Sequence, residues 1–161
     1  MTPDLNNFFI AITGAAAALT GLIFVGVSIN LARILSTPAL PVRALESLIL
    51  LLNIVVTSSI CLVPQSSVVW FGVEISFVAM ICWTLTLVLD LKMLRTSERV
   101  YLKHATRNII LSQLSLLPFV TAGVLLLRGT EGATYWLVPG ILFSLVKAVM
   151  DAWVLLIEIH R

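Results

Sequence analysis

Long apolar runs alternate with short polar or charged stretches along the whole chain. Five of these runs reach the roughly 20 apolar residues that an α-helix needs to cross a bilayer. They cover about 8–32, 44–63, 68–91, 108–127 and 134–158. The pattern therefore predicts an all-α integral membrane bundle with five transmembrane helices.

Turn-forming residues and charges separate the five runs. Pro38 and Pro41 break the first run from the second, Pro64 begins the next turn, and Gly129 and Gly132 lie in the last one. The remaining gap, 92–107, is longer and basic, and is predicted as a loop. Because no repeat or low-complexity tract interrupts this organisation, residues 1–161 are expected to form a single transmembrane domain.

Composition supports membrane insertion. Apolar residues make up 60% of the chain and charged residues only 11%, and the mean hydropathy is +1.09. Soluble domains carry close to a quarter charged residues, so this chain is too apolar to cover a water-facing surface. The net charge of +2 does not indicate nucleic acid as a partner, because the basic residues lie in the gaps between apolar runs.

Those basic residues orient the helices. With the N-terminus outside and the C-terminus in the cytoplasm, only Arg128 falls on the outer side, and Lys147 lies inside the fifth run. Cytoplasmic segments of membrane proteins carry the excess of Lys and Arg, which favours this orientation. The residues assigned to the cytoplasmic side are Arg33, Arg43, Lys92, Arg95, Arg99, Lys103, Arg107 and Arg161.

The loop 92–107 contains a basic residue at every fourth position. Arg95, Arg99, Lys103 and Arg107 would form one stripe if the third helix continued into this segment. Anionic lipid headgroups are the natural partner of such a stripe. The alternative is a plain positive-inside anchor without a lipid site.

The first predicted helix contains many small residues on one face. Steps of three and four residues align Gly14, Ala18, Gly21, Val25 and Ser28. Small residues let two helix backbones approach closely, which promotes helix association inside a membrane. The stripe is therefore a candidate pore or oligomer face. Packing of a central helix against its own neighbours is the alternative.

The fifth predicted helix carries two charges inside its apolar run. Lys147 lies near the middle of the run and Asp151 follows four residues later, on the same helix face. Charged groups inside a membrane are costly and usually mark functional sites. Because helical side chains lean toward the N-terminus, Lys147 is predicted to reach outward, toward Glu74 on the third helix. Asn53 lies at a similar depth on the second helix.

This predicted intramembrane polar centre of Lys147, Asp151, Glu74 and Asn53 allows three interpretations. The charged groups could relay protons or ions. They could form a closed salt-bridged network that fixes helix packing. They could also meet partners in another subunit.

No sequence motif indicates an enzyme. The chain has neither a phosphate-binding glycine-rich loop nor a nucleophile elbow, and His104 and His160 lack metal-ligand spacing. No catalytic residue, metal site or cofactor is therefore expected. A potassium-filter signature is missing as well.

Two segments carry a family resemblance. The run AALTGLIFVGVSINL at 17–31 and the ending AWVLLIEI at 152–159 resemble uncharacterised small bacterial multispanning integral membrane proteins, which have no assigned activity. The resemblance implies a bacterial inner-membrane location.

Two functions are consistent with these features. The first is a homo-oligomeric, channel- or transporter-like protein with an intramembrane polar centre. The second is a structural or regulatory accessory subunit that binds another membrane protein through the same groups. A polar path from Lys147 to water would favour the first, and a dry, fully paired Lys147 would favour the second.

Overall fold

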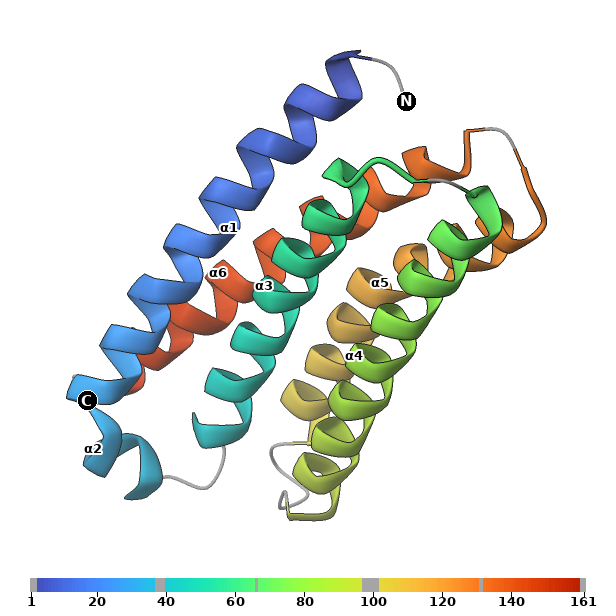
Figure 1. Ribbon diagram of the computed structural model, residues 1–161. Helices are drawn as coiled ribbons and strands as arrows, with labels where there is room; N and C mark the ends of the chain where they lie inside the picture. The colour runs from blue at the N-terminus through green and yellow to red at the C-terminus, as the bar shows by residue number, and fades with distance from the viewer. Residues whose placement is uncertain (1–2, 37–39, 66, 97–101, 131, 160–161) are drawn as a thin grey trace.

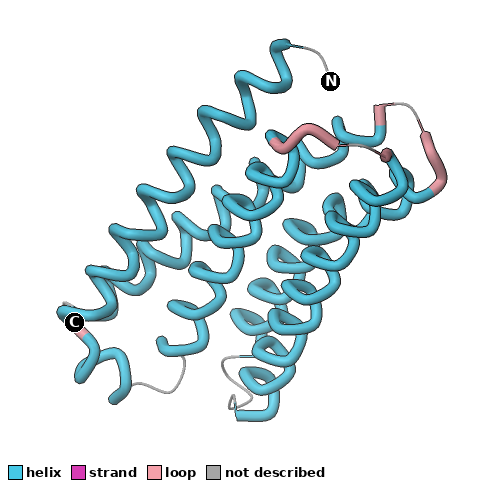
Figure 2. The backbone as a smooth tube through the Cα atoms, in the orientation of Figure 1, coloured by secondary structure: helices cyan, strands magenta, loops and turns pink. Residues whose placement is uncertain are grey.

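Helices make up nearly all of the chain in the computed structural model, which describes residues 3–36, 40–65, 67–96, 102–130 and 132–159 (Figure 1). Figure 2 shows that only short connections within these ranges are not helical. Side chains at 95, 96, 102–105, 158 and 159 are not described. The elements are α1 (Pro3–Ile29), α2 (Leu31–Ser36), α3 (Leu40–Leu62), α4 (Val68–Thr96), α5 (Leu102–Leu127), the 3₁₀ helix η2 (Ala133–Trp136) and α6 (Leu137–Ile159).

The prediction of an all-helical fold with five long apolar helices is confirmed. Within the described residues, α1, α3, α4, α5 and η2–α6 each include a segment long and apolar enough to cross a membrane. The helices extend beyond the predicted runs: α1 begins at Pro3 and α5 begins at Leu102. Hydropathy marks the part of a helix that fits the bilayer core, whereas backbone hydrogen bonding continues into polar residues such as Asn6 and Asn7.

The long helices run alternately up and down, and sequence neighbours tend to pack together. α4 lies against α5, while α3 contacts both α1 and α6, and α5 also contacts α6. In Figure 1, α1 lies at one side of the bundle. The apolar core between α3, α5 and α6 is filled by fully buried side chains, among them Ile54, Leu116, Phe119, Leu137 and Ile141.

Two glycines allow α4 and α5 to approach each other closely. A Cβ added to Gly123 would meet the backbone of Ser76 at 3.0 Å, and one added to Gly72 would lie 2.8 Å from the backbone nitrogen of Leu127. Any larger residue at either position would therefore push the two helices apart. This close pairing holds α4 in place beside the rest of the bundle.

The alternation of directions gives the bundle two ends. At the first, named here the basic end, α1, α4 and α6 finish and α3 and α5 begin (Figure 1). Arg33, Arg43, Lys92 and Arg107 lie near this end. At the other, named here the turn end, α3 connects to α4 and α5 connects to η2 and α6.

Candidate functional site: a buried polar cluster

Six polar residues from four helices meet inside the basic half of the bundle. This polar cluster consists of Glu46, Asp90, Asn108, Ser112, Lys147 and Asp151, and every member is at most 5% exposed. Glu46 and Asn108 each lie six residues after the start of their helix, and Asp90 lies six residues before the end of α4. At 1.5 Å per residue these three positions are all about 9 Å from the basic end.

Glu46 is the central acceptor of the polar cluster. Its Oε1 accepts a hydrogen bond from Ser112 Oγ at 2.7 Å, and its Oε2 accepts one from Asn108 Nδ2 at 2.8 Å. Lys147 Nζ lies 3.4 Å from the same Oε2. A fully buried carboxylate needs such donors, because desolvation without them costs several kcal/mol. Glu46 thereby connects α3 to both α5 and α6.

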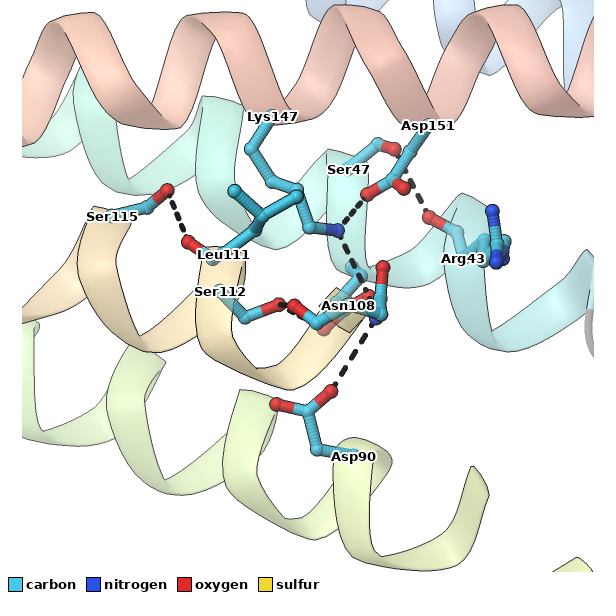
Figure 3. A network of polar contacts seen from close by, with 10 residues as sticks. Arg43, Ser47, Asp90, Asn108, Leu111, Ser112, Ser115, Lys147 and Asp151 are labelled. Carbon is cyan, nitrogen blue, oxygen red and sulfur yellow. Dashed lines mark hydrogen bonds and ion pairs between the residues drawn. The ribbon is translucent and has the colours of Figure 1, made fainter. Parts of the chain in front are cut away.

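Lys147 pairs with two carboxylates. Its ammonium contacts Asp151 four residues later on α6, as the sequence predicts, and also reaches Glu46 on α3. Figure 3 shows the Lys147 side chain extending toward Asp151 and Asn108. The ammonium is therefore held between two negative groups, with only 3% of the residue exposed.

Asp90 extends the polar cluster to α4. Asn108 Nδ2 lies 3.5 Å from Asp90 Oδ1, so the one amide bridges Asp90 and Glu46 (Figure 3). Asp90 Oδ2 is buried and has no hydrogen-bond partner among the described residues. One oxygen of this carboxyl group is therefore available to accept or carry a proton.

A small, partly open cavity lies beside the polar cluster. Its volume is about 40 Å³, and its lining combines five polar or charged residues with three apolar ones: Arg43, Arg107, Asn108, Lys147 and Asp151, and Leu111, Met150 and Val154. Arg107 is exposed and Arg43 half-buried. A space of this size holds a water molecule rather than an organic ligand. Asn108, Lys147 and Asp151 thus border a space between α3, α5 and α6 that is partly open to the outside of the bundle, whereas Glu46, Asp90 and Ser112 do not line it.

Two residues of the predicted polar centre lie elsewhere. Glu74 is exposed near the turn end, where it accepts a hydrogen bond from Gln65 at 3.2 Å. The carboxylate beside Lys147, a place predicted for Glu74, is that of Glu46. Helical side chains lean toward the N-terminus of their helix, which led to the prediction that Lys147 reaches Glu74. The Lys147 side chain instead bends toward Glu46 and Asp151, which lie nearer the basic end. Asn53 is buried, yet its amide forms no hydrogen bond among the described residues.

The small-residue stripe on α1 faces away from the bundle. Gly14, Ala18, Gly21, Val25 and Ser28 are all exposed. A Cβ added at Gly14 or Gly21 would have no neighbouring atom within 4 Å. The alternative in which this stripe packs against helices of the same chain is therefore wrong, and the face is open to lipid or to another chain.

The predicted basic stripe does not lie on one helix. α4 ends at Thr96 and α5 begins at Leu102, so Arg95 belongs to α4 whereas Lys103 and Arg107 belong to α5. Arg99 and the side chains of Arg95 and Lys103 lie outside the described residues. Arg107 is exposed at the mouth of the small cavity, and its predicted contact with lipid headgroups stays a prediction.

Sequence reasoning missed Ser112 and three residues nearer the helix ends, Glu46, Asp90 and Asn108. Glu46 lies only two residues inside the predicted run 44–63, where a carboxylate is ordinarily solvated, but α3 begins at Leu40, so Glu46 lies in the second turn of its helix. The alternating directions of the helices provide a sequence signal that could have identified these three residues. Counting residues from the basic end places all three side chains at one depth, where polar groups on neighbouring helices can meet.

The polar cluster does not resemble a metal site. Within the described part of the chain, no three His, Cys, Asp or Glu side chains are arranged to hold one metal ion. The donors that surround Glu46 are an amide, a hydroxyl and an ammonium, which stabilise a carboxylate by hydrogen bonding.

The described residues form a helical bundle with five helices long and apolar enough to cross a membrane and with a buried charged network. No protein-family model matches the sequence, and no curated protein or solved structure shows significant similarity to it.

Proposed function

We propose that the protein is a channel- or transporter-like membrane protein that moves protons, with the polar cluster as its proton-binding centre. The observation that carries this proposal is the excess of buried carboxyl groups over buried cations. Glu46, Asp90 and Asp151 face one buried ammonium, that of Lys147. Intramembrane carboxyl groups of this kind are typical of proton pathways.

Charge balance supports proton binding. Lys147 is the one cation among the buried residues of the polar cluster, and the guanidinium groups of Arg43 and Arg107 lie farther out, on the lining of the small cavity. With all three carboxyl groups ionised, the buried residues of the cluster carry more negative than positive charge. Because uncompensated charge inside a bundle costs several kcal/mol, a bound proton lowers this cost. Asp90 is the natural carrier, since its buried Oδ2 forms no hydrogen bond of ordinary geometry among the described residues.

The filled core favours a transporter over an open pore within one chain. The small cavity borders Asn108, Lys147 and Asp151 in the basic half of the bundle. Toward the turn end, fully buried residues such as Ile54, Leu116 and Phe119 occupy the space between the helices. Protons that cross the bilayer would therefore need a conformational change, or a path between two chains along the open face of α1.

Orientation and assembly belong to the same proposal. The distribution of Lys and Arg supports an outer N-terminus and a cytoplasmic basic end, so that the small cavity lies in the cytoplasmic half of the bundle. The exposed small residues of α1 support a homo-oligomer in which two copies contact through this face. A bacterial inner membrane is the proposed location.

Proton flux into liposomes tests the proposed function. The purified protein is reconstituted, a potassium gradient with valinomycin sets the membrane potential, and an enclosed pH-sensitive dye reports proton entry. We expect flux above that of protein-free liposomes. Asp90→Asn should lower the flux at least tenfold, because the amide has nearly the same shape but cannot exchange a proton.

Asp4→Asn is the matched control, because Asp4 is an exposed carboxylate on α1 outside the polar cluster. This variant should conduct like the unmodified protein. Flux at the level of protein-free liposomes, or an Asp90→Asn variant with unchanged flux, would contradict proton transport. Size-exclusion chromatography and circular dichroism establish that each variant is folded before reconstitution.

The accessory-subunit hypothesis has one observation in its favour. Lys147 is buried and paired with two carboxylates, as expected of a network that only fixes helix packing. Under this hypothesis the open face of α1 would contact a different membrane protein. Absence of proton flux, together with loss of folding when the polar cluster is altered, would favour this role.

A further inference from the structure

A second polar feature lies at the turn end, well away from the polar cluster. A groove between α3 and α4 has a volume of about 400 Å³ and is lined by Ile60, Val63, Gln65, Glu74, Phe77 and Val78. Its volume falls within the range of small-molecule sites. Glu74 precedes Asp90 by 16 residues on α4, which corresponds to about 24 Å along the helix.

The groove has one formal charge among its lining residues. Glu74 is exposed and lies six residues inside α4, about 9 Å below the start of that helix. Gln65 Nε2 donates to it at 3.2 Å and lies 3.4 Å from the carbonyl of Ile60. No Lys or Arg forms an ion pair with Glu74 in the described part of the chain.

An exposed carboxylate in an apolar groove at this depth calls for a positive partner. Charged groups within the membrane zone are costly and are normally paired. Ile60, Val63 and Val78 provide an apolar surface around the carboxylate, and the exposed ring of Phe77 can contact a cation through its face. The charge and the lining thus complement a molecule that is both cationic and apolar.

We propose that the groove between α3 and α4 binds a monovalent lipophilic organic cation, such as a quaternary ammonium or phosphonium compound. The positive centre pairs with Glu74, and the apolar substituents pack on Ile60, Val63, Phe77 and Val78. The ligand enters laterally from the membrane, because Glu74 and Phe77 are exposed on the outer surface of the bundle. This site is independent of the proposed proton movement.

Binding of radiolabelled tetraphenylphosphonium to the full-length protein in detergent tests the proposal by equilibrium dialysis. Saturable binding with one site per chain is expected. Glu74→Gln should weaken binding at least tenfold, whereas Glu74→Asp, which keeps the charge, should retain most of it. Asp4→Asn removes an exposed carboxylate outside the groove and should bind like the unmodified protein.

A neutral analogue gives a second readout that requires no variant. Triphenylphosphine oxide has a similar apolar body without the charge and should neither bind saturably nor displace the phosphonium. The proposal is wrong if the two compounds bind alike, if no saturable binding occurs, or if Glu74→Gln binds normally. A Glu74→Gln variant that changes oligomeric state would instead assign the groove to an interface between copies. None of these results depends on proton flux.

Discussion

At the scale of single residues, Glu46 connects three of the four helices of the polar cluster, α3, α5 and α6. Its two oxygens accept from Ser112, Asn108 and Lys147, which come from α5 and α6. Removing this carboxylate would leave two neutral donors and one ammonium with fewer partners in a buried site. Unpaired buried polar groups each cost about 1–3 kcal/mol.

A double-mutant cycle tests the coupling between Glu46 and Lys147. Glu46→Gln and Lys147→Met each remove one charge of a buried pair, and breaking such a pair costs about 3–5 kcal/mol of stability. The double variant removes both charges, so its loss should be smaller than the sum of the single losses by about 0.5–3 kcal/mol. Thermal unfolding in detergent provides the measurement.

Leu45→Ala is the control for this cycle, because Leu45 neighbours Glu46 on α3 but is exposed on the bundle surface. It should change stability by no more than about 0.5 kcal/mol. Strict additivity of the two single losses would mean that Glu46 and Lys147 do not stabilise each other.

The sequence identified part of the polar cluster and missed the rest for a physical reason. Lys147 and Asp151 can be identified from the sequence because a charged residue in the middle of a membrane-spanning run cannot be placed in water at a helix end. Glu46 and Asp90 lie closer to helix ends, where a carboxylate is ordinarily solvated, so their burial depends on neighbouring helices. Which side chains meet depends on the rotation of each helix about its axis and on the conformations of long side chains such as Lys147. Hydropathy contains information on neither.

At the scale of helices, the glycines that matter for packing are not those of the glycine-rich first helix. Gly72 and Gly123 lie where α4 and α5 nearly touch, and Gly14 and Gly21 have open space around them. The sequence predicted all five long helices, because length and hydropathy are properties of each segment alone. It drew attention to the small residues of α1, but which small residues lie at a contact depends on the tertiary arrangement.

Matched glycine substitutions test this difference between the helices. Gly123→Val should lower stability by about 1–3 kcal/mol, because the new side chain would collide with the backbone of Ser76. Gly21→Val introduces the same side chain on the open face of α1 and should stay within about 0.5 kcal/mol. Thermal unfolding of the two variants in detergent checks the contrast, and equal losses would contradict the packing of α4 on α5.

At the scale of the whole molecule, the alternating helices bring charges from distant parts of the sequence to one depth near one end. The polar cluster forms because α3 and α5 begin, and α4 and α6 finish, at the basic end. Its proposed access to the cytoplasm depends on five crossings with the N-terminus outside. A different number of crossings, or the reverse orientation, would change which compartment exchanges protons with the small cavity.

Labelling of single cysteines in intact cells tests this arrangement most directly. In a background with Cys61→Ala and Cys82→Ala, Thr130→Cys places a thiol at the turn end and Ser36→Cys places one at the basic end, both at exposed positions. An impermeant maleimide should label Thr130→Cys in intact cells, and should label Ser36→Cys only after the cells are permeabilised. Labelling of Ser36→Cys in intact cells would contradict the proposed orientation, and labelling of both positions from outside would contradict the five crossings.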